Sequence, residues 1–169
     1  MLARPRRRTW LRAAGAIAAT QLAAACGFQL RRAAQFQFRT LYAGFPPGSP
    51  TDGAFRRQMR VNDGVTLVAR PEAAEVRLEV LHEFREKEIV GFSSTGRPRE
   101  YQLRLTFAFR LTDQGGEELI PPTQLLLRRE ITTTDEQLIA KEQEEADLFR
   151  RMHADLAEQL VLRLAAVRR

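Results

Sequence analysis

The sequence predicts an α+β domain in which two helices pack on one face of a four- to five-stranded sheet that is mixed and mostly antiparallel. Three observations predict this class. Several segments alternate apolar with polar residues, as strands with one buried face do. Residues 149–167 instead carry one apolar stripe at helical spacing, and a shorter helical pattern follows the first strand. Because such a stripe must pack on another element, we expect the apolar face of the sheet to lie beneath it.

The first strand and the first helix are predicted before residue 64. The strand pattern places these residues on one face: Phe36, Phe38, Thr40 and Tyr42. After a break rich in proline and glycine, Ser49 can cap a short helix that begins at Pro50 and has Asp52 in its first turn. Phe55 and Met59 would share the buried face of that helix, because residues four apart lie on one side.

Further strands are predicted from residue 65 onward, beginning with a brief one over residues 65–68. The clearest alternation has these inward residues: Val76, Leu78, Val80, His82 and Phe84. After a loop predicted over residues 91–99, the next strand has these: Tyr101, Leu103, Leu105, Phe107, Phe109 and Leu111. A last strand, after Pro121 and Pro122, runs through Leu125, Leu127, Arg129 and Ile131. The residues between these positions are mostly charged or polar, so we expect the opposite face of the sheet to be hydrophilic.

The last predicted element is a helix with one apolar stripe. The stripe consists of Phe149, Met152, Leu156, Leu160, Leu164 and Val167. Steps of three and four residues place these side chains on one side of a helix. Charged residues such as Arg151 and Glu158 lie mostly off the stripe, which predicts a helix that is half buried.

The charge balance argues against a nucleic-acid partner. Five of the 27 basic residues and none of the 21 acidic ones lie in the first 25 positions, which leaves 22 basic against 21 acidic residues. The remaining chain is therefore nearly neutral, whereas binding through counterion release requires a strongly basic surface. We expect no nucleic-acid partner.

Residues 1–25 have the three parts of a bacterial export signal. Arginines at the start precede a moderately apolar stretch over residues 13–19, and three alanines stand directly before Cys26. A cysteine after such a run resembles the lipobox, in which the cysteine receives a diacylglyceryl group and an N-acyl chain. The pair Arg7-Arg8 also resembles a twin-arginine motif, so the general secretory and twin-arginine routes both stay open.

The expected organisation follows from this signal. Residues 1–25 would be removed, residues 26–33 would form a lipidated tether, and residues 34–169 would form a single domain of ordinary size. The protein would be attached to a membrane through the lipid on Cys26.

No catalytic constellation stands out, and we expect no enzyme. Cys26 is the sole cysteine, and lipidation would remove the thiol that a Cys–His pair needs. Neither His82 nor His153 has the spaced partners of a metal site, so no metal or cofactor is expected beyond the covalent lipid. Ser93 and Ser94 lie in a predicted loop without the nucleophile elbow of serine hydrolases. An envelope hydrolase remains the least favoured alternative.

Basic residues in two places are candidates for binding an anion. Arg97 and Arg99 stand in the loop between the two longest strands, and Arg129 and Lys141 lie on and after the last strand. In an exported lipoprotein the available polyanion is the phosphorylated lipid A headgroup, to which guanidinium groups bind through paired hydrogen bonds. A solvated charged surface explains each residue equally well, and both interpretations stay open.

Four motifs resemble the LptE family of lipopolysaccharide-assembly lipoproteins. They are Cys26-Gly27-Phe28-Gln29-Leu30-Arg31, Gly96-Arg97 followed by Glu100-Tyr101-Gln102-Leu103, Leu138-Ile139-Ala140-Lys141, and Asp155-Leu156-Ala157-Glu158-Gln159-Leu160. Each motif is short, but their order and spacing cover the chain from Cys26 to its end.

The resemblance implies a two-helix, four-stranded domain and a place at the outer membrane. A member of this family sits as a plug in the lumen of the β-barrel LptD, in a one-to-one complex on the periplasmic side, and helps that barrel deliver lipopolysaccharide to the cell surface. The resemblance also implies lipopolysaccharide contacts at Lys141 and near Arg97 and Arg99. A free periplasmic lipoprotein that carries a small amphiphile between helices and sheet remains the main alternative.

Overall fold

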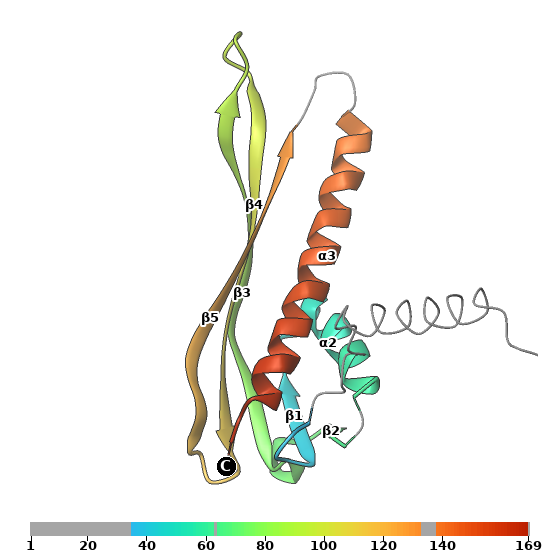
Figure 1. Ribbon diagram of the computed structural model, residues 1–169, viewed down its shortest axis with the longest axis vertical. Helices are drawn as coiled ribbons and strands as arrows, with labels where there is room; N and C mark the ends of the chain where they lie inside the picture. The colour runs from blue at the N-terminus through green and yellow to red at the C-terminus, as the bar shows by residue number, and fades with distance from the viewer. Residues whose placement is uncertain (1–34, 63, 133–137, 169) are drawn as a thin grey trace, which may run out of the picture. The chain divides into compact units, whose positions relative to one another are not determined.

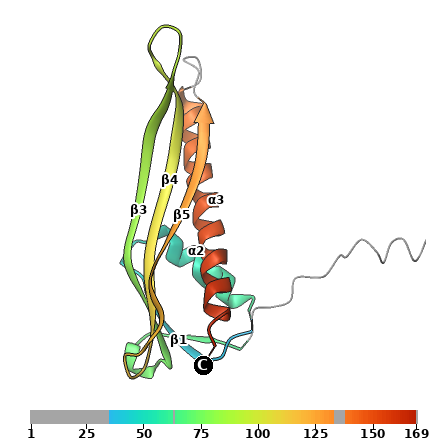
Figure 2. The same ribbon diagram turned by 60° about the vertical axis from the view of Figure 1, so that its left-hand side comes forward.

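Five strands form one mixed sheet, in the order β2-β1-β3-β4-β5, in the computed structural model, which describes residues 35–62, 64–132 and 138–168 (Figure 1). The strands are β1 (Thr40–Gly44), β2 (Thr66–Val68), β3 (Val76–Phe92), β4 (Pro98–Asp113) and β5 (Glu118–Thr132). The helices are α2 (Pro50–Arg60) and α3 (Leu138–Ala165), and a short 3-10 helix, η1 (Pro71–Ala73), precedes β3. Both long helices lie on the same face of the sheet (Figure 1, Figure 2). The predicted α+β class is confirmed.

The described residues belong to one compact unit, Ala33–Arg169. The predicted export signal, the tether and Cys26 lie outside them. Within the described part of the chain, neither helix combines the length and the apolarity needed to cross a bilayer.

The sheet combines parallel and antiparallel pairing. β1 runs parallel to both of its neighbours, β2 and β3, while β3, β4 and β5 pair antiparallel in chain order. β1 reaches only Val76 to Glu79 of β3, so the rest of that edge of β3 has no strand beside it among the described residues. The long β3–β4 hairpin therefore extends well past the parallel part of the sheet (Figure 2).

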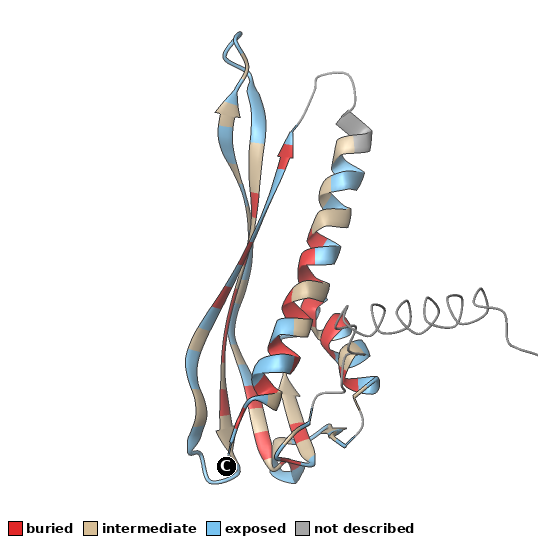
Figure 3. Ribbon diagram, viewed as in Figure 1, coloured by how far each residue is buried: buried red, intermediate tan, exposed pale blue. Residues whose placement is uncertain are grey.

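The predicted helices form as their sequences indicate. Ser49 caps α2, because its Oγ accepts the N–H of Asp52 at 3.2 Å, and Pro50 occupies the first turn. All members of the apolar stripe of the last helix are buried: Phe149, Met152, Leu156, Leu160, Leu164 and Val167. They pack with Phe55 and Met59 of α2 and the inward residues of β4 in one core (Figure 3).

The first strand differs from its prediction. The chain bends at Gln37 and at Arg39, and β1 begins only at Thr40. As a result Phe38 and Leu41, three residues apart, are the buried side chains, instead of an alternating set from Phe36 onward. The predicted set of buried residues in the first strand was wrong, because the bends interrupt the alternation of side chains between the two faces.

A β-bulge reverses the predicted faces of β3 after Val80. Val80 lies opposite Phe109 and His82 opposite Ala108, so Leu81 has no partner on β4. Beyond the bulge, Glu83 faces the helices, whereas His82 and Phe84 are exposed and Phe84 is 56% accessible. The prediction that His82 and Phe84 point inward was wrong.

Two strand ends also differ from their predictions. The predicted loop over residues 91–99 is a tight turn, in which Gly96 adopts a φ of 78° and Arg99 already belongs to β4. β5 begins at Glu118 and includes Pro121 and Pro122, which the sequence placed before the strand. Both prolines are exposed on an edge strand and lie between the pairs Leu111–Ile120 and Phe109–Thr123, where the register with β4 shifts.

Candidate functional site

The far end of the β3–β4 hairpin carries Arg97 and Arg99. β5 ends at Thr132, opposite Glu100, so among the described residues the hairpin is two-stranded beyond that point. Arg97 lies in the turn, where its backbone N–H donates to Ser93 Oγ at 3.1 Å, and Arg99 follows in the first residues of β4. Both residues are exposed, and the hairpin end extends past the first turn of α3 (Figure 1, Figure 2).

The other two basic candidates are held by acids of α3. Arg129 lies on the helix-facing side of β5, and its Nη2 is 2.7 Å from Asp155 Oδ2. Lys141 lies near the start of α3, and its Nζ is 2.7 Å from Glu144 Oε2. The structure thus brings Arg97 and Arg99 together on one hairpin end and places Arg129 and Lys141 in separate ion pairs.

A charged groove of about 560 Å³ lies between β3 and α3. It is lined by Arg85, Glu86, Lys87, Glu142, Glu145, Ala146 and Phe149. Lys87 Nζ lies 2.6 Å from Glu145 and 4.5 Å from the ring centre of Tyr101, while the Arg85 guanidinium stacks over Phe149 at 5.4 Å. The sequence analysis missed these residues because the bulge turns Arg85 and Lys87 toward α3. This groove has mostly charged walls, unlike the apolar pocket that an amphiphile carrier requires.

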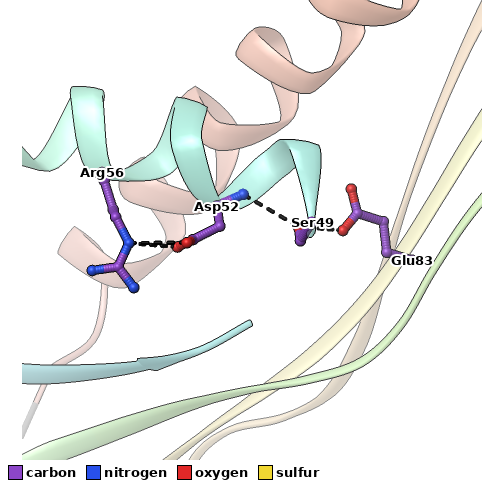
Figure 4. Close-up of polar contacts among 4 residues, drawn as sticks. All are labelled: Ser49, Asp52, Arg56 and Glu83. Carbon is purple, nitrogen blue, oxygen red and sulfur yellow. Dashed lines mark hydrogen bonds and ion pairs between the residues drawn. The ribbon is translucent and has the colours of Figure 1, made fainter. Parts of the chain in front are cut away.

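The bulge also builds a buried polar cluster from Ser49, Thr51, Glu83 and His153. Ser49 Oγ donates to Glu83 Oε2 at 2.5 Å, and Thr51 Oγ1 donates to Glu83 Oε1 at 2.6 Å. Thr51 Oγ1 also lies 2.8 Å from Nδ1 of His153. The threonine has a single hydroxyl proton, so Nδ1 must be the donor in that contact. Figure 4 shows Ser49 at the start of α2 directed toward Glu83 on β3.

Hydrogen bonds affect the pKa of Glu83 more than its burial does. The side chains of Glu83 and His153 are 8% and 4% exposed, and Nδ1 of His153 lies 3.3 Å from Glu83 Oε1. Burial raises the pKa of Glu83, but hydrogen bonds from His153, Ser49 and Thr51, together with the charge of His153, lower it from 4.5 to about 2. Glu83 is therefore an ionised carboxylate that joins β3 to both helices.

This cluster is structural, because its geometry leaves no group available to a substrate. Thr51 is fully buried, and Nε2 of His153 is enclosed without a hydrogen-bond partner among the described residues. Ser93 contacts the turn residues Thr95 and Arg97, and His82 lies on the opposite face of the sheet from His153. The described residues also contain no group of three side chains that could hold a metal ion.

Three solved structures with a similar fold are described as bacterial lipoproteins. Lipoprotein B of Nitrosomonas europaea is 30% identical, with a TM-score of 0.71 over 83% of this chain and 91% of that one. Rare lipoprotein B of Shewanella oneidensis (20% identity, TM-score 0.66, 76% and 95% coverage) shares the fold. So does a minor lipoprotein of Acinetobacter baumannii (22%, 0.64, 78% and 93%). No curated protein matched the chain. The fold is thus that of a lipoprotein domain.

Residues 27–164 match the model of the family described as LptE, lipopolysaccharide-assembly. The chain belongs to this family, which confirms the resemblance carried by the four sequence motifs. The family consists of non-enzymatic lipoproteins, so the prediction of no enzyme is confirmed. Membership also implies a lipoprotein of the outer membrane that acts in lipopolysaccharide assembly.

Proposed function

We propose that this lipoprotein plugs the LptD β-barrel, in a one-to-one complex, and assists the assembly of the barrel and the insertion of lipopolysaccharide into the outer leaflet. The family match over residues 27–164 carries the proposal, because it spans nearly the whole described domain. The charge pattern of the sheet supports it. On the face away from the helices, Glu88 pairs with Arg104 at 2.5 Å and Glu79 with Arg110 at 2.6 Å. These ion pairs suit the polar lumen of a barrel, although Phe84 and Leu126 are also exposed on this face.

The proposed anchor is the lipid on Cys26. Removal of residues 1–25 would leave a lipidated tether over residues 26–33 and the domain over residues 34–169 on the periplasmic side. A lipid anchor raises the effective concentration of the domain near a membrane-embedded partner.

Arg97, Arg99, Arg129 and Lys141 are the proposed lipopolysaccharide contacts. Arg97 and Arg99 would act together, because both are exposed on one hairpin end. Arg129 and Lys141 already form ion pairs with Asp155 and Glu144, so a phosphate group would compete with these carboxylates. Phosphate groups suit arginine because its planar guanidinium binds two oxygens at once.

Co-purification from native membranes tests the proposal. The full chain, tagged at its C-terminus and extracted in mild detergent, is expected to bring down a large β-barrel in equal molar amount. Its mass is expected to begin at Cys26 and to include the acyl chains, and a Cys26→Ser variant serves as the control for the anchor. Recovery of the wild-type protein as a free monomer would contradict the plug, and a mass that still begins at Met1 would contradict the anchor.

A further inference from the structure

The edge of β3 from Arg85 to Phe92 is open among the described residues. β1 ends beside Glu79, and the start of α2 covers Glu83 through its contacts with Ser49 and Thr51. Beyond this point no described strand pairs with the edge. An open edge presents unpaired N–H and C=O groups, to which another extended chain can add.

β5, an edge strand of the sheet, and the open part of β3 differ in how they are protected. β5 carries Pro121 and Pro122, which interrupt any added ladder. The open part of β3 has no proline, and its last residues are uncharged and accessible: Ile89 at 49%, Val90 at 50% and Phe92 at 65%. Lys87 and the register shifts on both sides of Gly91 partly blunt this edge, but its backbone still has no strand beside it among the described residues, so a partner strand can add there.

The charged groove runs along this same edge. Consecutive residues Arg85, Glu86 and Lys87 all line it, although neighbours in a strand point to opposite faces. The groove therefore wraps around the edge itself, and Glu142 and Phe149 of α3 form its other wall. A strand added to β3 would place alternate side chains in this groove.

Charge selects the kind of strand that fits. Arg85 is engaged by Phe149 and Lys87 by Glu145. Glu86 and Glu142, which also line the groove, form no ion pair with any residue of the described ranges. The groove thus offers negative charge to an incoming strand, and basic side chains would complement it.

A second copy of this chain fits this edge poorly. A two-fold axis pairs antiparallel edges so that facing residues come from the same side of the sheet. In a register centred on Glu86 or Lys87 this would set base against base and acid against acid. Like charges directly opposite each other are unfavourable, which disfavours a second copy in those registers.

We propose that the edge of β3 from Arg85 to Phe92 binds an extended, basic segment of the barrel partner as an added strand. Naming the barrel as the partner rests on the proposed function. Main-chain hydrogen bonds would hold the segment, and its basic side chains would enter the groove toward Glu86 and Glu142.

Photo-crosslinking in cells tests this contact. A benzoylphenylalanine at position 86 or 90 of the full chain is expected to yield an adduct with the mass of the barrel. The same group at position 124, on the opposite edge strand, serves as the matched control and should give at least tenfold less adduct. A dimer of this chain from position 86 or 90, or equal yields from all three positions, would overturn the proposal.

A charge reversal and amide exchange complete the test. The double variant Glu86→Lys/Glu142→Lys should lower the yield of barrel at least tenfold, whereas Glu117→Lys/Glu130→Lys, two exposed acids elsewhere, should not. Amides of residues 85–92 should exchange at least tenfold more slowly in the complex than in the free full chain. A complex that forms without this protection overturns the added strand and leaves the plug intact. If the wild type recovers no barrel, both proposals fail.

Discussion

The Glu83 carboxylate joins three elements that are distant in the chain. It accepts hydrogen bonds from the hydroxyl groups of Ser49 and Thr51 at the start of α2, and it pairs with His153 of α3. A buried carboxylate is tolerated only when its oxygens are hydrogen-bonded, and both oxygens of Glu83 are. The geometry therefore fixes where α2 begins relative to α3 and β3.

Replacing Glu83 with glutamine should destabilise the domain in a pH-dependent way. The folded pKa of Glu83 is about 2 against an ordinary 4.5, so ionised Glu83 stabilises the fold above pH 4.5. This contribution, on the order of 3 kcal/mol, is lost as the pH falls through 4.5 toward 2. Urea unfolding of wild type and Glu83→Gln should differ by about that amount at pH 7 and converge near pH 2.

Glu79→Gln is the matched control for that experiment. Glu79 pairs with Arg110 on the surface, where its side chain is 53% exposed, and such pairs contribute little. A Glu83→Gln variant that stays as stable as Glu79→Gln at every pH would contradict the role assigned to the cluster.

Regular elements were predictable because their rules are local. The cap at Ser49, the stripe of α3 and the alternation of β4 each depend on residues a few positions apart. The bulge at Leu81 was not predictable. The alternation of apolar and polar residues along one strand does not show which of its residues lacks a partner on the neighbouring strand. Everything that depends on it, including the inward Glu83 and the groove residues, was missed for that reason.

The bulge makes one residue of a central strand dispensable. Deleting Leu81 leaves Val80 opposite Phe109 and His82 opposite Ala108, and it keeps every later pair. The variant should fold with a free energy of unfolding within about 1.5 kcal/mol of wild type, since only a local twist changes. Circular dichroism and urea unfolding measure this outcome.

Deletion of Thr106 is the contrasting variant. Thr106 lies in a regular part of β4, between Leu105 and Phe107, which are both fully buried. Its removal would move every side chain on one side of the deletion to the opposite face of the sheet. The core could then not form, so no cooperative unfolding is expected. If both deletions behaved alike, the assignment of Leu81 as the extra residue would be wrong.

At the scale of the described domain, the apolar core and the exposed hairpin end occupy different regions. Buried residues lie between the sheet and the helices, whereas the end of the β3–β4 hairpin is exposed (Figure 3). The sequence located both regions, but it placed Arg99 in a loop. It gave no sign that Asp155 holds Arg129, because that contact joins residues far apart in the chain, whereas Lys141 and Glu144 are only three residues apart on one helix.

Reversing the charge of the hairpin end should weaken lipopolysaccharide binding without affecting stability. Arg97→Glu/Arg99→Glu would replace two charge-assisted contacts with repulsion, which predicts at least about tenfold weaker binding. Equilibrium binding of purified lipopolysaccharide to the full-length complex measures this. Arg150→Glu/Arg151→Glu, on the exposed side of α3, should bind normally. Equal affinity of both variants and wild type would leave Arg97 and Arg99 as ordinary surface charges.

The parallel strand β1 sets an order for assembly of the sheet. β3, β4 and β5 are consecutive in the chain, so short connections can close their ladders early. β1 pairs with β3 only after the chain has passed through α2 and β2. The loop that this pairing closes is therefore longer than the turns between β3, β4 and β5. A nascent chain can thus complete its three-stranded meander first, and docking of the N-terminal strand finishes the folding reaction.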